Sequence, residues 1–325
     1  MKWTEQLIQT NAGKRIAICP IIVSASRSTD IPAFYVKWFL NRIKAGYTKW
    51  LNPFNPNSSK YISFSKTRVF IFWTKNPQPF LKCLPELDNA GLVYYFLYTL
   101  NDYDNENLEP YAPFLEKRIN TFKTLSKLIG REKLIWRFDP LILTDTITVD
   151  VLLDRIKNIA NRLLGFTERL VVSFVDITKY KKVQNNLKRA GVKAKEFSLD
   201  EKLYFARELY MLNNNWGFDL FTCAEEIPLE EFGIQHNKCI DNELLVKLFP
   251  EDKTLMEFLY NDTNLLTSLK NLKDKGQRKH CKCIPSKDIG QYNTCPHLCV
   301  YCYANSSPVI VERNFRNHTE FSETI

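Results

Sequence analysis

The chain has 325 residues, of which 45 % are hydrophobic, enough to bury the core of one large domain or two small ones. It has no N-terminal basic-then-apolar segment and no apolar run near the ~18 residues that span a bilayer, so we expect a cytoplasmic protein without a membrane partner. The formal net charge of +9 suits a polyanionic partner, although segments such as "KYKKVQNNLKRAGVKAKE" are typical of solvated helix faces.

Apolar runs rich in β-branched and aromatic residues recur along the chain and predict strands. They are continuous rather than alternating, which is typical of strands buried on both faces. In chain order they are "AICPIIVSAS" (17–26), "RVFIFWTK" (68–75), "LVYYFLYTL" (92–100), "KLIWRFD" (133–139), "RLVVSFVD" (169–176) and "FDLFTCAE" (218–225). A seventh, short strand is predicted at "YTKWLN" (47–52).

Helix patterns with recognisable ends lie between these runs. Ser198 and Glu201 have capping-box spacing before "KLYFARELYML", and Pro32 falls in the first turn of a helix after Asp30. Glycines stand where helix C-caps belong, at Gly46, Gly130 and Gly165. Strand and helix in alternation predict an α/β fold whose parallel sheet curls into a partial or complete (β/α) barrel.

The pattern changes near residue 227. Segments 227–249 and 255–276 read as helices without strands between them, and the remaining chain is rich in cysteine. We therefore expect a barrel-like domain over 1–230, a helical cover over 231–280 and an iron–sulfur cluster-binding tail over 281–325, with the tail led back to the sheet.

Each predicted strand ends in polar residues. Because parallel α/β folds build their sites at the carboxyl ends of strands, these side chains are predicted to converge on one mouth that binds a cofactor or substrate. Taken singly, each is better explained as a helix cap or turn residue, but six strands that all end this way favour a site. Arginine and lysine suit a carboxylate or phosphate, and the acidic residues suit amines or hydroxyls. The candidates are Arg27, Lys75, Asn76, Asn101, Arg137, Asp139, Asp176 and Glu225.

The segment "NTCPHLCVYCYANSS" (293–307) contains Cys295, Cys299 and Cys302. In a reducing compartment, clustered cysteines are more often metal ligands or catalytic thiols than disulfides. A structural zinc site needs four ligands, and His297 is poorly spaced to supply the fourth. Three thiolates instead suit a [4Fe–4S] cluster with one iron left open. Cys19 and Cys83, in apolar surroundings, are expected in the core.

This C-x3-C-x2-C pattern, with an aromatic residue before the third cysteine, resembles the cluster motif of the radical S-adenosylmethionine superfamily. "CPHLCVYCYA" is especially similar to members such as spore photoproduct lyase. The resemblance implies a partial (β/α)6 barrel and a cluster on the three cysteines whose open iron chelates S-adenosylmethionine. It also implies reductive cleavage to a 5′-deoxyadenosyl radical, with electrons from a donor such as a ferredoxin or flavodoxin.

Nearly the whole chain resembles an uncharacterised bacterial family of unknown function that has its cysteine cluster at the C-terminus. The segments that carry this resemblance are "ASRSTDIPAFY", "FWTKNP", "WRFDP" and "DIGQYNTCPHLCVYCYAN". Two departures from the superfamily stand out: the triplet follows all the predicted strands instead of the first, and there is no Gly-Gly-Glu motif for the cofactor's amino group. Folding would have to return the tail to the mouth, as a circular permutation does.

Four further cysteines match a second all-thiolate site, either an iron–sulfur cluster or zinc. They are Cys223, Cys239, Cys281 and Cys283. In the alternative interpretation, Cys223 and Cys239 are core residues and only the other two approach the first cluster. His236 and His280 are candidates to replace one of the four.

Two functions fit these patterns. The first is a radical S-adenosylmethionine-type enzyme acting on an unknown small-molecule or nucleic-acid substrate, with catalytic residues that the sequence does not identify. The second is a non-catalytic, metal-stabilised module, with zinc or an iron–sulfur cluster, that binds nucleic acid through its lysines. Charges of both signs converging on one mouth favour the enzyme, since a binding module does not need them.

Overall fold

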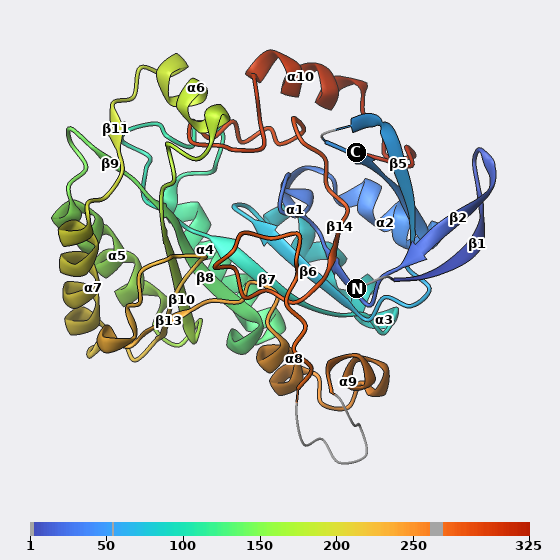
Figure 1. Cartoon of the computed structure of the whole chain (residues 1–325), viewed down its shortest axis with the longest axis horizontal. Coiled ribbons are helices and arrows are strands. Elements are labelled where there is room, and N and C mark those ends of the chain that lie inside the picture. Colours follow the sequence, from blue (N-terminus) through green and yellow to red (C-terminus); the bar gives the residue numbers. More distant parts are fainter. Residues whose placement is uncertain (1–2, 54, 261–268) are drawn as a thin grey trace.

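The structure is a computed structural model that describes residues 3–53, 55–260 and 269–325 (Figure 1). Its main element is an eight-stranded sheet in which all neighbouring strands are parallel. In sheet order the strands are β13 (Ile234–His236), β12 (Asp219–Thr222), β10 (Arg169–Phe174), β8 (Leu134–Leu141), β7 (Val93–Thr99), β6 (Val69–Thr74), β3 (Ile22–Ser24) and β14 (Lys287–Asp288). The six long apolar runs therefore all contribute strands to one parallel sheet, as predicted.

Helices connect consecutive strands of this sheet, so the fold is mixed α/β. They are α1 (Ile31–Phe34) and α2 (Val36–Ala45) after β3; η1 (Gln78–Cys83) and α3 (Leu84–Asn89) after β6; α4 (Leu115–Ile129) and η2 (Arg131–Lys133) after β7; α5 (Val149–Leu163) after β8; and α6 (Lys181–Arg189) and α7 (Leu199–Asn213) after β10. A two-stranded sheet of β9 (Leu143–Thr144) and β11 (Ala194–Lys195) lies beside them.

Both faces of the main sheet are covered, which explains why the strand sequences are continuously apolar. Phe72, Phe96 and Trp136 belong to the core on the face that packs against helices α1–α5 and α7. Alternate residues such as Ile71 and Leu97 belong to a second core, which includes residues of α8 and α9. Along each strand, successive side chains enter different cores.

The predicted helix ends are confirmed. Ser198 and Glu201 form a capping box at α7, and the Asp30 side chain caps α1 by accepting a hydrogen bond from the Ala33 backbone N–H at 3.0 Å. Gly46 and Gly130 are the C-caps of α2 and α4. Gly165 follows the α5 cap residue with a positive φ, which glycine adopts without steric cost.

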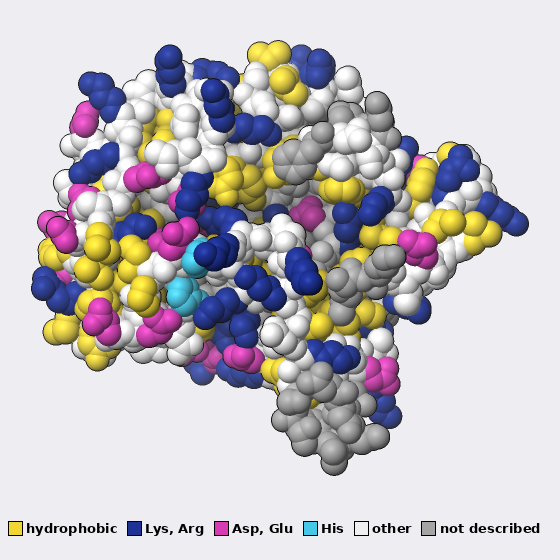
Figure 2. Space-filling view, viewed as in Figure 1, with side chains coloured by type: hydrophobic (Ala, Val, Ile, Leu, Met, Phe, Trp, Pro, Cys, Tyr) yellow, Lys and Arg dark blue, Asp and Glu magenta, His cyan; other side chains and the backbone are white. Residues whose placement is uncertain are grey.

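A separate four-stranded sheet was not predicted. Its order is β1 (Thr4–Thr10), β2 (Gly13–Cys19), β5 (Asn55–Ser63), β4 (Tyr47–Asn52). The run 17–26 is divided between two sheets: Cys19 ends β2, and after Pro20 the chain enters β3. The predicted strand 47–52 forms as β4, but it pairs antiparallel with β5 and not with the main sheet. Hairpin β1–β2 projects from the body of the protein (Figure 1, Figure 2).

The predicted helices after residue 227 are largely wrong. Segment 227–249 forms η3 (Glu230–Phe232), β13 and α8 (Asn242–Leu248). Gly233 adopts a left-handed conformation that ends η3, and the chain then pairs with β12 as β13. In segment 255–276, α9 (Lys253–Leu259) ends before extended Tyr260. Residues 261–268 lie outside the described part, and 269–276 are not helical. Helix α10 (Pro308–Asn317), in the tail, was not predicted.

The C-terminal tail returns to the main sheet through β14, which pairs in parallel with β3. The backbone N–H of Ile289 continues this pairing by donating to the Ser24 carbonyl at 3.1 Å. Glycine is required at the next position, because a Cβ on Gly290 would overlap the Ser26 side chain. The chain end packs on the other side, where Trp38 Nε1 donates to the Ser322 carbonyl at 2.9 Å. The tail therefore spans the carboxyl ends of the strands (Figure 1).

Replacing Gly290 by alanine should weaken the docking of β14. We expect Gly290→Ala to lower the free energy of unfolding by about 1–3 kcal/mol, the usual cost of overpacking, measured by urea denaturation. Gly276→Ala is the matched control, since its nearest neighbour to a new Cβ is the flexible Asp274 Oδ1 at 3.3 Å. Equal stability of the two variants would show that the close approach of Gly290 to Ser26 does not constrain the tail.

Candidate functional site at the strand ends

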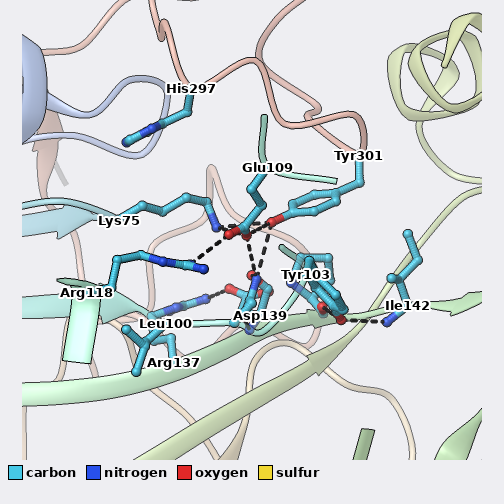
Figure 3. A network of polar contacts seen from close by, with 12 residues as sticks. Lys75, Leu100, Tyr103, Glu109, Arg118, Arg137, Asp139, Ile142, His297 and Tyr301 are labelled. Atoms are coloured by element: carbon cyan, nitrogen blue, oxygen red, sulfur yellow. Dashed lines mark hydrogen bonds and ion pairs between the residues drawn. The ribbon is translucent and has the colours of Figure 1, made fainter. Parts of the chain in front are cut away.

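The carboxylate of Glu109 lies at the centre of the polar mouth (Figure 3). It is on the loop after β7, and its side chain is 2 % exposed. It accepts hydrogen bonds from Lys75 Nζ at 2.7 Å, Asn101 Nδ2 at 2.8 Å and Arg118 Nη1 at 2.9 Å. The Tyr301 hydroxyl, from the tail, also donates to Glu109. One buried carboxylate thus joins two strand ends, a helix and the tail.

The charges around Glu109 compensate one another. Burial alone would raise the pKa of Glu109, but Lys75 and Arg118, with hydrogen bonds from Lys75 and Tyr301, hold it at about 2. Burial would likewise lower the pKa of Lys75, and the Glu109 carboxylate outweighs it, so that the pKa is raised. Glu109, Lys75 and Arg118 are therefore ionised at neutral pH. Their burial is tolerated because each charge has a partner of opposite sign.

A second ion pair lies beside the first. Arg137 Nη2 donates to Asp139 Oδ2, and the Ser173 hydroxyl donates to the other oxygen of the same carboxylate. Asn101 connects the two pairs, because its Oδ1 accepts from the Asp139 backbone N–H at 2.8 Å while its amide reaches Glu109. Arg137 Nη1 donates to Cys239 Sγ at 2.8 Å.

Asp30 anchors the tail to the sheet. Its Oδ1 accepts from the Thr74 hydroxyl at 2.8 Å, and its Oδ2 accepts from the Lys75 backbone N–H at 2.7 Å. His297 Nε2 lies 2.9 Å from the same Oδ2, and its Nδ1 lies 3.3 Å from the Tyr111 carbonyl oxygen. Both ring nitrogens of His297 thus face oxygen atoms, in agreement with the view that it is a poor fourth metal ligand.

The triplet loop is held above these residues. Asn186 on α6 donates to the carbonyls of Cys302 and Asn305 at 2.9 and 3.0 Å. The Asn305 side chain donates to the Cys295 carbonyl at 2.8 Å, which closes the loop on itself. Tyr301, between the second and third cysteines, reaches down to Glu109. The prediction that the tail places the triplet beside the mouth is confirmed.

The three cysteines are half-buried, and their surroundings raise the pKa of each thiol, which favours the neutral form. Burial raises the pKa of Cys299 to about 12, although Lys75 opposes it. The pKa of Cys295 is raised by burial, by Asp30 and by the two other thiols, so the three sulfurs are close enough to interact. Burial also raises the pKa of Cys302, whose sulfur accepts from the backbone N–H groups of Ala304 and Asn305 at 3.3 Å each.

A metal or cluster would displace the protons from these thiols. The donor set fits such a group in its chemistry, with three neighbouring sulfurs, two backbone N–H groups aimed at one of them and the Lys75 cation nearby. Within residues 3–53, 55–260 and 269–325, however, no group of three or more His, Cys, Asp or Glu side chains is already arranged to hold a metal ion. Every cysteine is free of disulfides.

The other predicted residues lie apart from the centre of the mouth. Arg27 stacks on the Trp73 ring at 5.5 Å, and Asn76 Oδ1 accepts from the Gln78 backbone N–H at 3.4 Å. Asp176 pairs with Arg278 at 2.9 Å, and Glu225 pairs with Lys202 at 3.2 Å. The structure therefore brings together Lys75, Asn101, Arg137 and Asp139, and the ligand-binding role of all eight residues stays a prediction.

Sequence reasoning missed Glu109 and Arg118. Glu109 belongs to the acidic loop "NDYDNENLEP", in which nothing distinguishes it from Asp102, Asp104 or Glu106. Arg118 looks like an ordinary helix charge, yet its side chain is 0 % exposed. The one sequence signal for Arg118 is its place on the apolar side of α4, beside buried Ile119 and Phe122.

Fold and site together define an α/β protein with a parallel sheet, a buried ionic network at the strand ends and a cysteine-rich tail folded over it. The chain belongs to the family described as "Domain of unknown function (DUF1848)", which matches residues 22–304. No curated protein and no solved structure matches it. In the described part of the chain, no helix combines the length and apolarity needed to cross a membrane.

Removing the central carboxylate should destabilise the fold. Glu109→Gln leaves Lys75 buried without its anion and Arg118 with Asp104 as its remaining carboxylate, so we expect the free energy of unfolding to fall by about 3–5 kcal/mol, measured by chemical denaturation. Glu116→Gln is the matched control, because that exposed glutamate pairs with Arg162 at the surface and should change little. A Glu109→Gln protein as stable as Glu116→Gln would contradict the role given to this network.

Proposed function

We propose that this protein is a radical S-adenosylmethionine-type enzyme, with a [4Fe–4S] cluster on Cys295, Cys299 and Cys302 and its substrate at the carboxyl ends of a partial (β/α) barrel. The observation that carries this proposal is the position of β14. It lies at the edge of the parallel sheet beside β3, and Cys295 follows its last residue, Asp288, by seven positions.

The radical S-adenosylmethionine superfamily, which the triplet resembles, carries its cluster on the loop after the first barrel strand. If β14 is taken as the counterpart of that first strand, the triplet loop after it would correspond to the superfamily's cluster loop, although β14 is the last strand in the chain. Reading the sheet from β14 through β3, β6, β7 and β8 to β10 gives six adjacent parallel strands that begin with the cluster loop. A circular permutation accounts for this order and supports the proposal.

The residues beside the triplet suit an anionic group. The backbone N–H groups of Ala304 and Asn305 donate to Cys302 Sγ, and Lys75 places a positive charge near Cys299. Tyr301 is 8 % exposed and fills the space between the cysteine loop and Glu109, so it would keep water from one side of the cluster. When bound, the cluster and S-adenosylmethionine together would supply a 5′-deoxyadenosyl radical for hydrogen abstraction.

The ion pairs of the mouth suggest how a ligand would be held. Lys75 is already paired with Glu109, and Arg137 with Asp139, so neither charge is bare. A ligand carboxylate or amine would bind by exchanging with one of these partners, which keeps the buried charges compensated. In place of a Gly-Gly-Glu motif, the segment after β3 offers the hydroxyls and backbone of "SASRSTD" (24–30) for the amino group of S-adenosylmethionine.

A nucleic-acid-binding module has weaker support. Lys and Arg side chains spread over the face seen in Figure 2, and Asp and Glu side chains lie among them. The cations at the mouth are engaged in ion pairs and are buried, as Lys75, Arg118 and Arg137 illustrate. The net charge of +9 is then the remaining argument for this function.

Anaerobic reconstitution with iron and sulfide should produce a brown protein with about four irons at the triplet. Cys295→Ala, Cys299→Ala and Cys302→Ala should each abolish the colour or leave an unstable cluster, measured by absorbance and by iron per chain. Cys19→Ala and Cys83→Ala are the matched controls and should keep the cluster, since these cysteines lie elsewhere in the fold.

The reconstituted and reduced protein should also cleave S-adenosylmethionine to 5′-deoxyadenosine, detected by chromatography and mass spectrometry. The Cys299→Ala protein treated in the same way sets the background. An intact, reduced cluster that never cleaves S-adenosylmethionine would refute the radical enzyme, and absence of iron uptake would favour the binding module.

A further inference from the structure

A second group of cysteines assembles on the other side of Arg137. Cys223 follows β12, Cys239 lies between β13 and α8, and Cys281 and Cys283 precede β14. The sulfurs of Cys223 and Cys239 are 3.7 Å apart. The Cys283 sulfur accepts from the Ile240 backbone N–H at 3.5 Å, beside Cys239, and Cys281 lies two residues before Cys283 in the chain. Three distant parts of the chain thus bring these cysteines into one region of the fold.

These thiols lie at the edge of the second apolar core, to which Cys239, Cys281 and Cys283 belong, and polar groups also reach them. Arg137 Nη1 donates to Cys239 Sγ at 2.8 Å, and Asn237 Nδ2 donates to the same sulfur at 3.3 Å. Two further guanidinium groups interact electrostatically with these thiols, Arg27 with Cys283 and Arg278 with Cys223.

Arg137 gives the Cys239 sulfur a charged hydrogen-bond donor, which a purely apolar core would not. Its side chain is 5 % exposed, and a buried guanidinium needs anionic or acceptor partners. Asp139 takes Nη2, and the sulfur of Cys239 takes Nη1. Four cysteines gathered beside this guanidinium supply the donors of a tetrathiolate site, and a bound cation would replace the thiol protons.

We propose that Cys223, Cys239, Cys281 and Cys283 bind one zinc ion as a structural tetrathiolate site. Tetrahedral zinc with Zn–S bonds of about 2.3 Å places two ligand sulfurs about 3.8 Å apart, and the Cys223–Cys239 separation of 3.7 Å matches that edge. A four-iron cluster attaches its cysteines to different irons and holds their sulfurs farther apart. The close spacing therefore indicates a single ion.

The remaining sulfurs have to converge for the site to close. In the part of the chain that the structure describes, no three of these thiols already surround a common point as metal ligands. Closing the site requires the side chains of Cys281 and Cys283 to turn toward Cys239, whose neighbour Ile240 already donates its N–H to Cys283 Sγ. Neither histidine considered for this site joins it: His236 faces Glu230 at 3.5 Å and His280 faces Glu226 at 3.8 Å.

Such an ion would hold in place the segment that leads into the C-terminal tail. The segment that carries Cys281 and Cys283 leads directly into β14, and Ile284 N–H already donates to the Ile240 carbonyl at 3.1 Å. Zinc would add bonds between this segment and the end of β12, so that the start of the tail is tied to the opposite half of the sheet. The site uses none of the triplet cysteines and is independent of the proposed function.

The test is metal analysis of the full-length chain expressed with zinc. We expect one zinc per chain in the wild type and in a variant with Cys295, Cys299 and Cys302 all replaced by alanine, and none in Cys239→Ser or Cys283→Ser. Cys19→Ser is the matched control, a buried cysteine that should leave the zinc content unchanged. Retention of zinc in the triplet variant separates this site from the cluster.

A second measurement tests the proposal if the Cys239→Ser and Cys283→Ser proteins do not fold. Co²⁺ added to the metal-free triplet variant should give the intense sulfur-to-cobalt charge-transfer bands of a tetrahedral tetrathiolate. Zinc should protect Cys223, Cys239, Cys281 and Cys283 from alkylation, as mapped by mass spectrometry. No zinc in the wild type, no such bands, or iron and sulfide bound by the triplet variant would each overturn the proposal.

Discussion

The buried carboxylate of Glu109 has to be compensated, and the means of compensation determine how the tail sits on the sheet. Lys75 comes from the end of β6, Arg118 from α4 and Tyr301 from the tail, and all three meet at this one side chain. If any of these three side chains moved away, the buried Glu109 carboxylate would lose a hydrogen-bond donor. The strand ends, the helix and the tail therefore hold one another in place. Asp30, bonded to Lys75 N–H and His297, makes a second such connection.

This constraint also bears on chemistry. Both faces of the main sheet are packed with apolar side chains, so polar groups can gather only where the strands end. There the charges are arranged as neighbouring ion pairs, Lys75 with Glu109 and Arg137 with Asp139, bridged by Asn101. In the proposed enzyme, such a network of paired charges would receive a polar ligand by exchange of one partner, which costs less than bringing a bare charge into a dry site.

The two groups of cysteines have different electrostatic surroundings. The half-buried cysteines of the triplet lie near Asp30 and Glu109, and Lys75 and backbone N–H groups offset those anions. Cys239, in the second group, is bonded directly by the Arg137 guanidinium, whose other nitrogen holds Asp139. Arg137 therefore lies between the second group and the mouth, and a change of charge on one side would be felt through it on the other.

The sequence alone determined the elements that depend on neighbouring residues. The six buried strands and the caps at Asp30, Ser198, Gly46 and Gly130 follow from local patterns. The triplet is visible because its three cysteines lie close together in the sequence. Tertiary structure decided the rest. Glu109 meets Tyr301 across 192 positions and Arg137 meets Cys239 across 102, pairings that no local pattern encodes. β13 and β14 are too short to show a period, and they are strands because the edges of the sheet offer them backbone partners.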